Sequence, residues 1–178
     1  MNKKIKVSVI GLGFVGAAMS IAIASVKNNK KQPVFNVFGI EQNNKKGIKI
    51  ANLLNEGIFP IPTNDKKLTK LAHHVIKNKN LKCYNDIKNI KDSKIIVIDI
   101  NLDLKIQNIY NPDVNFNNFI NSIKKIVAQI DFKTLIIIQT TVPPGTTNEL
   151  IKPIVDGHIK KNSFSNDMIN LAYSFERV

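Results

Sequence analysis

The stretch Lys6-Val-Ser-Val-Ile-Gly-Leu-Gly-Phe-Val-Gly16 decides the fold of this chain. Its apolar first half predicts a short β-strand, and Gly11, Gly13 and Gly16 then form a G-x-G-x-x-G loop. In dinucleotide-binding units the first glycine permits a tight turn and the second lets the backbone approach a pyrophosphate. The third lets the following helix pack close to the strand. The pattern also occurs elsewhere, so the surrounding residues decide its interpretation.

The same stretch has the features of a targeting or membrane segment. Residues 1–6 are basic, and residues 7–26 carry no charge and are about long enough to span a membrane. Against this interpretation, three glycines interrupt the stretch where a phosphate-binding loop requires them, and a second strand-like run follows at residues 34–40. We therefore expect the segment to remain in a cytoplasmic protein that has no membrane partner.

Composition indicates one domain. The chain has 178 residues, of which 43% are hydrophobic, enough for one substantial core but cramped for two. A net charge of +13 raises the possibility of nucleic-acid binding. Every basic residue except Arg177 is a lysine, however, and the lysines are spread along the whole chain. We attribute the charge to a solvated surface and expect no nucleic-acid partner.

Strand and helix patterns alternate along the chain, which predicts βαβ units. We expect an α/β fold with a Rossmann-like, doubly wound parallel sheet, formed by residues 1–178 as a single domain. The stretch 86–91 reads as a turn or helix and 101–114 as a loop. The expected strands are 5–10, 34–40, 81–84, 95–100, 135–138 and 169–173, and the expected helices are 15–26, 44–55, 65–77 and 115–130.

Ligands of such sheets bind beyond the carboxyl ends of the strands, so the residues there are candidates for a site. Glu41 follows the second strand. A carboxylate at this place accepts hydrogen bonds from both hydroxyls of the adenosine ribose and repels a 2′-phosphate, which favours NAD over NADP. The alternative is a surface acid at the start of a helix. Lys45 and Lys46 are either contacts for a phosphate or adenine, or solvated lysines.

Two more strand ends carry polar residues. Asp99 lies at the end of the fourth expected strand, and Asn101 and Asp103 follow it, on the side expected for the nicotinamide. Paired acids suggest acid–base chemistry or a metal, but no metal-ligand motif accompanies them, so we favour loop capping and expect no metal. Thr140 and Thr141 follow the fifth strand and leave two hydroxyls available to a ligand.

A turn and a helix start follow these threonines. Pro144-Gly145 suits a type II turn, which needs a residue with positive φ at its third position. Thr146 and Glu149 have the spacing of a capping box, so we assign Thr146 a structural role.

Five segments, in order over nearly the whole chain, resemble the N-terminal domain of nucleotide-sugar 6-dehydrogenases. This family comprises UDP-glucose, GDP-mannose and UDP-N-acetyl-hexosamine dehydrogenases. The segment Thr-Val-Pro-Pro-Gly-Thr-Thr and the final Glu-Arg-Val are far more specific than the glycine loop. The segments are 9–16, 39–41, 54–57, 141–147 and 171–178.

The resemblance implies a two-step, four-electron oxidation of a sugar C6 alcohol to a carboxylate. The family uses two NAD and a cysteine that forms a thiohemiacetal and then a thioester. As catalytic residues, Thr141 matches a threonine that contacts the cofactor and the catalytic water, and Glu176 matches a glutamate that helps to activate this water. The cofactor-binding residues that the resemblance implies are Gly11, Gly13, Phe14, Val15, Gly16, Glu41, Lys46, Asn101, Thr141 and Glu176.

The chain also departs from the family pattern. Leu102-Asp103 stands where relatives usually have Thr-Pro, and Phe175 stands where they have proline. The family nucleophile lies downstream of the Glu-Arg-Val motif, where this chain stops at Val178. Cys83, the single cysteine, lies in an expected strand and reads as a small buried residue in a reducing compartment.

We therefore expect the chain to bind NAD without oxidising a nucleotide sugar alone. The substrate domain, the catalytic cysteine and the region through which the family forms homo-oligomers would belong to a missing C-terminal half or to a separate subunit. The alternative is a free-standing NAD-binding regulatory module without catalysis.

Overall fold

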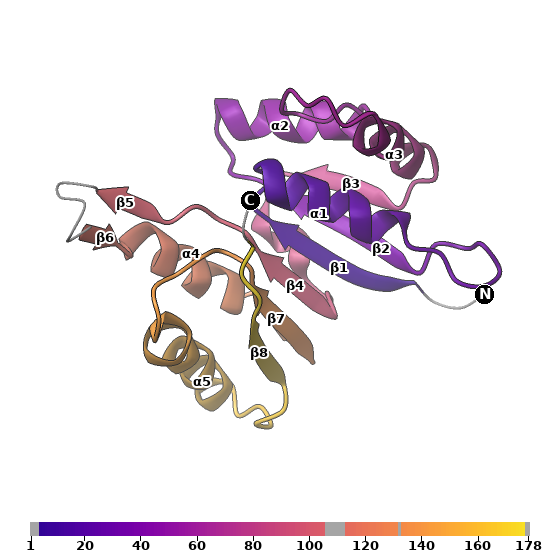
Figure 1. Cartoon of the computed structure of the whole chain (residues 1–178). Helices are drawn as coiled ribbons and strands as arrows, with labels where there is room; N and C mark the ends of the chain where they lie inside the picture. The colour runs from indigo at the N-terminus through magenta and orange to yellow at the C-terminus, as the bar shows by residue number, and fades with distance from the viewer. Residues whose placement is uncertain (1–3, 106–112, 132, 177–178) are drawn as a thin grey trace.

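Six parallel strands form one sheet in the order β3-β2-β1-β4-β7-β8 (Figure 1). The computed structural model describes residues 4–105, 113–131 and 133–176, without the side chains of 103–105, 113 and 114. Strand order reverses beside β1, which is the topology of a doubly wound sheet and opens a crevice between β1 and β4. The predicted fold class is confirmed. The strands are β1 Ile5–Ile10, β2 Phe35–Ile40, β3 Leu81–Tyr84, β4 Ile95–Ile98, β7 Thr134–Ile138 and β8 Ile169–Tyr173.

Helices cover both faces of the sheet (Figure 1). The central strands are therefore apolar on both sides, as β4 with the sequence Ile-Ile-Val-Ile illustrates. Val97 packs into the core beneath α1, while its neighbours Ile96 and Ile98 pack into the core beneath α4 and α5. One face carries α1 Phe14–Ser25, α2 Lys45–Asn55 and α3 Lys66–Lys77, and the other carries α4 Asn117–Val127 and α5 Lys152–Lys161.

The ends of α2 and α3 follow from local chemistry. The side chain of Asn44 accepts the Gly47 N–H at 2.8 Å and so caps α2, and the side chain of Asp65 caps α3. Gly57, with a φ of +80°, ends α2, and the Ile58 N–H then bonds back to the Leu53 carbonyl. Both predicted helices are confirmed to within one residue.

The N-terminal stretch forms part of the central sheet and the first helix. It is divided between β1 and the 12-residue α1, and Ala17, Ile21 and Ala24 of this helix are buried against the sheet. Among the helices of the described residues, none has the length and apolar character needed to cross a bilayer.

Two predictions for the middle of the chain were incomplete. The expected loop at 101–114 contains β5 Asp103–Lys105 and β6 Asp113–Asn115, which pair with each other antiparallel, apart from the main sheet. Three-residue strands are too short to show an alternating pattern. The uncertain stretch at 86–91 is a 3₁₀ helix, Ile87–Ile90, capped by Asp86.

The predicted capping box at Thr146 was wrong. Thr146 has helical backbone angles and makes no side-chain capping bond, and the chain enters α5 through a π-helical turn, Thr147–Ile151. The type II turn before it fits, because Gly145 has a φ of +86° and the Thr146 N–H bonds to the Pro143 carbonyl at 3.2 Å. The Thr146 N–H is thus bonded to a turn carbonyl, and the expected side-chain cap is not formed.

Candidate functional site

One row of residues crosses the sheet just beyond its carboxyl end. The last residues of neighbouring strands are paired in register, so the first residue after each strand lies beside the first residue after the neighbouring strand in the sheet. Backbone hydrogen bonds continue into this row. The Asp99 N–H donates to the Ile10 carbonyl and the Gln139 N–H donates to the Ile98 carbonyl, both at 2.8 Å. In a doubly wound sheet this edge binds the ligand. From β3 to β8 the row reads Asn85, Glu41, Gly11, Asp99, Gln139 and Ser174.

The fold itself requires two of the three glycines in the loop. Gly11 has a φ of +89°, and a Cβ on it would lie 2.1 Å from the Asp99 carbonyl oxygen. A Cβ on Gly16 would lie 1.9 Å from the Gly11 carbonyl oxygen. Gly13 differs, because its φ is −62° and nothing lies within 4 Å of a Cβ placed there. Folding therefore gives no reason for glycine at Gly13, whereas the close approach of a ligand does.

The N-terminus of α1 is open to an anion. Gly13 is its capping residue and offers no side-chain bond to the first turn, in which Phe14 and Val15 are the first residues. Unpaired N–H groups and the helix dipole together favour a phosphate at such an end.

Glu41 is hydrogen-bonded to the glycine loop. Its carboxylate accepts the Leu12 N–H at 2.7 Å through one oxygen and the Gln42 N–H at 2.8 Å through the other. Two backbone donors fix the orientation of the half-buried carboxylate beside the cleft. The remaining lone pairs are available to hydroxyl donors of a ligand.

A cleft of about 950 Å³ lies along this edge. Among the predicted cofactor-binding residues, Gly11, Gly13, Glu41, Lys46 and Asn101 line it. Sequence reasoning missed its opposite wall, which is the polar face of α4. The available signal was that this helix follows directly on the fourth strand and its polar loop. The missed residues are Asn118, Asn121, Ser122 and Lys125, together with Asn85 after β3.

The other predicted residues do not line the cleft. Gly16 is buried in the first turn of α1, and Val15 is half-buried. Phe14 is exposed and packs edge-on against Phe59, with ring centroids 5.6 Å apart. The contact with Phe59 was not foreseen from the sequence.

Thr141 and Glu176 lie together at the β7 and β8 side of the edge. The Thr141 hydroxyl donates to the Glu176 backbone carbonyl at 3.1 Å across 35 positions of sequence. The buried Gln139 amide donates to the Glu176 carboxylate, also at 3.1 Å. The two predicted catalytic residues are thus brought together, and the role of Gln139 in holding Glu176 was not foreseen.

Asp99 lies between the loop and this second group. Burial raises the pKa of its carboxyl, a hydrogen bond from the Gly16 N–H opposes the shift, and the nearby Glu176 carboxylate adds to it. Asp99 therefore caps the first turn of α1, where we expected it to cap its own loop. The side chain of Asp103 lies outside the described residues.

Cys83 is buried in β3, as predicted. Its side chain is 4% exposed, and burial raises the pKa of the thiol to about 12. Nucleophilic attack needs the thiolate. The role of family nucleophile therefore does not fall to Cys83.

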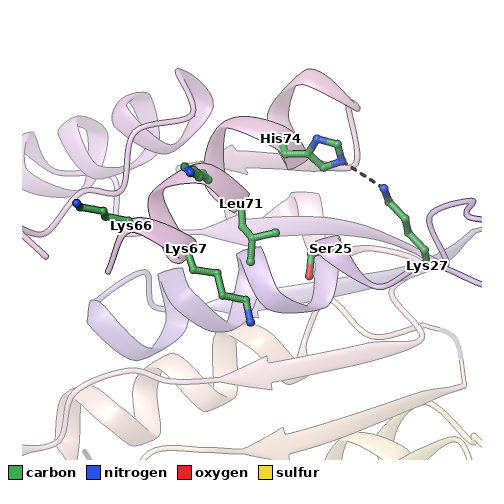
Figure 2. A pocket seen from close by; sticks show the side chains of 7 residues that line it. Ser25, Lys27, Lys66, Lys67, Leu71 and His74 are labelled. Carbon is green, nitrogen blue, oxygen red and sulfur yellow. Dashed lines mark hydrogen bonds between the residues drawn. The ribbon is translucent and has the colours of Figure 1, made fainter. Parts of the chain in front are cut away.

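A second hollow, of about 760 Å³, lies between α1 and α3 (Figure 2). It is rich in lysine, and the Lys27 ammonium donates to His74 Nε2 at 3.3 Å. None of the predicted site residues lies in it. Across the described part of the chain, no three His, Cys, Asp or Glu side chains gather as a metal site requires. The residues of the hollow are Ser25, Lys27, Lys66, Lys67, Lys70, Leu71 and His74.

Comparison with known proteins gives a consistent result. The family model of the UDP-glucose/GDP-mannose dehydrogenase family, NAD binding domain, matches residues 5–178. UDP-N-acetyl-D-mannosamine dehydrogenase of Pyrococcus horikoshii is 24% identical over 149 residues, which are 83% of this chain and 31% of the relative.

Solved structures agree in fold. NDP-N-acetyl-D-galactosaminuronic acid dehydrogenase from Methanosarcina mazei Go1 superposes with a TM-score of 0.83 at 23% identity, over 99% of this chain and 35% of its own. A ternary complex of GDP-mannose dehydrogenase from Pseudomonas aeruginosa gives 0.76 at 20% identity, over 97% and 36%. The chain thus spans about a third of the length of these relatives.

Proposed function

Since this chain belongs to the UDP-glucose/GDP-mannose dehydrogenase family, we propose that it serves an enzyme that oxidises the C6 alcohol of a nucleotide sugar to a carboxylate. The chain is the NAD-binding domain of this family. The sugar, the use of two NAD per sugar and the contribution of the rest of the protein are part of the proposal.

The observation that carries the proposal is the contrast between Gly13 and its neighbouring glycines. Gly11 and Gly16 are required by backbone contacts, but Gly13 borders open space at the start of α1, where it offers no side-chain cap to the N–H groups of Phe14 and Val15. A pyrophosphate bound by the first-turn N–H groups would need that space. Glu41 supports the same placement, because its fixed carboxylate is suited to accept the ribose hydroxyls. Lys46, on the same wall, is suited to a phosphate or the adenine edge.

NAD supplies the hydride acceptor when it is bound. We propose that Thr141 and Glu176 act on the water that hydrolyses the thioester. Glu176 takes a proton from this water, and its carboxylate is held for that task by the Gln139 amide. The Thr141 hydroxyl donates its hydrogen bond to the Glu176 backbone carbonyl. Its oxygen can therefore accept a hydrogen bond from the water or the cofactor.

We propose that the nucleophilic cysteine comes from outside the 178 residues. The one thiol of this chain, Cys83, is buried with a raised pKa, and the relatives are about three times as long as the matched region. We propose that a C-terminal half or a separate subunit supplies the nucleophile, the sugar-binding surface and the oligomer contacts. A cytoplasmic location, suggested by the single free thiol, belongs to the same proposal.

The test has two stages. Calorimetric titration of the chain with NAD should show binding, and mixtures of NAD with UDP-glucose, GDP-mannose or UDP-N-acetylmannosamine should yield no NADH. Joined to a C-terminal region that carries the cysteine, the chain should yield two NADH for each molecule of the sugar it accepts. A yield of one would contradict the two-step oxidation. Failure of every sugar, with NAD binding intact, would favour the regulatory module without catalysis.

A further inference from the structure

We propose that Asp99 is a proton-linked positioning residue of the cofactor site, so that binding of the dinucleotide pyrophosphate is accompanied by uptake of a proton on the Asp99 carboxyl. The inference rests on the proposed placement of the pyrophosphate at the start of α1.

Asp99 lies directly beneath the glycine loop. In the row at the sheet edge it follows Gly11, and its carbonyl oxygen lies 2.1 Å from the position of a Cβ on Gly11. One carboxyl oxygen lies 3.1 Å from the position of a Cβ on Gly16. The Asp99 carboxyl accepts a hydrogen bond from the Gly16 N–H. The carboxyl thus occupies a donor in the first turn of α1 and lines the cleft beside the loop.

This position leaves the N–H groups of Phe14 and Val15 for the pyrophosphate. The capping residue Gly13 offers them no side-chain partner. An anion bound by these two N–H groups would therefore lie at the same helix turn as the Asp99 carboxyl. Two negative charges at such a distance disfavour each other strongly in a partly desolvated site.

The charges around Asp99 add to this conflict. The Glu176 carboxylate, after β8, repels the charged form of Asp99 and so raises its pKa, and α1 contributes no charged side chain. No salt bridge joins Asp99 to a cation of the described residues. The other charged side chains along the cleft are Glu41 after β2, Lys46 on α2, Asp86 before the 3₁₀ helix and Lys125 on α4.

The protonated carboxyl resolves the conflict. Its carbonyl oxygen still accepts the Gly16 N–H, so the helix turn remains capped, while the negative charge is removed. The pKa of Asp99 is already raised by burial and by Glu176 in the free protein. Pyrophosphate would raise it further, and by linkage NAD must bind more weakly as the pH rises.

The experiment compares wild type with Asp99→Asn, which is neutral at every pH and keeps an oxygen acceptor for Gly16. NAD dissociation constants are measured from pH 5 to 8.5, with calorimetry in two buffers of different ionisation enthalpy to count protons. Wild type should lose affinity about fivefold or more over this range and should take up protons. The variant should show a flatter profile and tighter binding at pH 8.

A matched control is Asp86→Asn, which removes an exposed carboxylate from the same cleft. It should retain the wild-type profile. Parallel profiles for wild type and Asp99→Asn, or equal proton counts, would overturn the inference while leaving NAD binding intact. Absence of NAD binding at every pH would instead contradict the proposed function.

A carboxyl NMR titration of the free protein tests the first step without a cofactor. Asp99 should titrate above the ordinary range of aspartate. A normal or lowered pKa would overturn the inference even if NAD did not bind. Circular dichroism of the variant checks that it is folded.

Discussion

The Glu41 carboxylate accepts the Leu12 N–H at 2.7 Å, so the acid that follows β2 is hydrogen-bonded to the middle of the glycine loop. A Cβ on Gly47 would lie 2.1 Å from the Gln42 carbonyl oxygen and 3.0 Å from Glu41 Cγ, so the start of α2 presses against the same segment. The loop, the acid and α2 therefore form one packed unit. A change at Glu41 should affect both cofactor preference and loop position.

Glu41→Ala should weaken NAD binding by about tenfold or more, because hydrogen bonds to a charged group contribute about 1.5–3 kcal/mol. NADP binding should fall less or even rise, since the carboxylate that repels a 2′-phosphate is gone. Calorimetric titration with both cofactors measures the ratio.

Glu41→Gln separates the two roles of this side chain. Its amide oxygen still accepts the Leu12 N–H, so the loop should keep its position, but the repelling charge is absent. An NADP-to-NAD ratio that stays at the wild-type value in both variants would remove Glu41 from the ribose site.

Gly13→Val and Gly16→Val should fail in different ways. A Cβ at Gly13 has no protein atom within 4 Å, so the cost to folding should stay near that of a poorer helix cap, about 1 kcal/mol. NAD binding should be abolished, because the side chain would occupy the space proposed for the pyrophosphate.

At Gly16 the Cβ would lie 1.9 Å from the Gly11 carbonyl oxygen, so the loop must move. We expect a loss of about 3 kcal/mol or more in the free energy of unfolding. Urea denaturation and NAD titration of both variants give the comparison. Normal NAD affinity in folded Gly13→Val would place the pyrophosphate elsewhere.

The sheet and the loop could be predicted because their signals are local. Continuous apolar runs such as β4 and the caps Asn44 and Asp65 act within a few residues, and these elements were placed almost correctly. Thr146 shows the limit of local patterns, because a Thr-x-x-Glu spacing does not reveal that Thr146 already has helical angles and is 4% exposed.

The part of the site that could be predicted consists of residues that directly follow strands in the sequence. Glu41 and the glycines follow strands, so the topology rule places them at one edge. The wall formed by α4 and the links from Gln139 to Glu176 and from Asp99 to Gly16 depend on distances between elements remote in sequence. Such contacts are fixed by packing and have no local signature.

Cys83 should be unreactive in the native protein. Its thiol is buried and its pKa is raised to about 12, so the thiolate fraction at pH 8 is negligible. Iodoacetamide at pH 8 should modify the chain only after denaturation, as measured by intact mass. Cys83→Ser should leave NAD binding unchanged if the variant is folded, and rapid alkylation of the native chain would contradict the burial of Cys83.

Asp99 should also make stability depend on pH with a defined sign. Its pKa is raised in the folded state, so the folded protein binds this proton more tightly than the unfolded chain does. The stabilisation is complete below the ordinary aspartate pKa of about 3.9 and is lost as the pH rises through the higher, folded value. Because Asp99→Asn lacks this proton, wild type should lose stability relative to the variant across that window. Urea denaturation at pH 4, 6 and 8 gives the difference in the free energy of unfolding. A difference that is constant with pH would show that the Gly16 N–H balances burial and Glu176 at this carboxyl. A difference that moves in favour of wild type would show that the Gly16 N–H outweighs them.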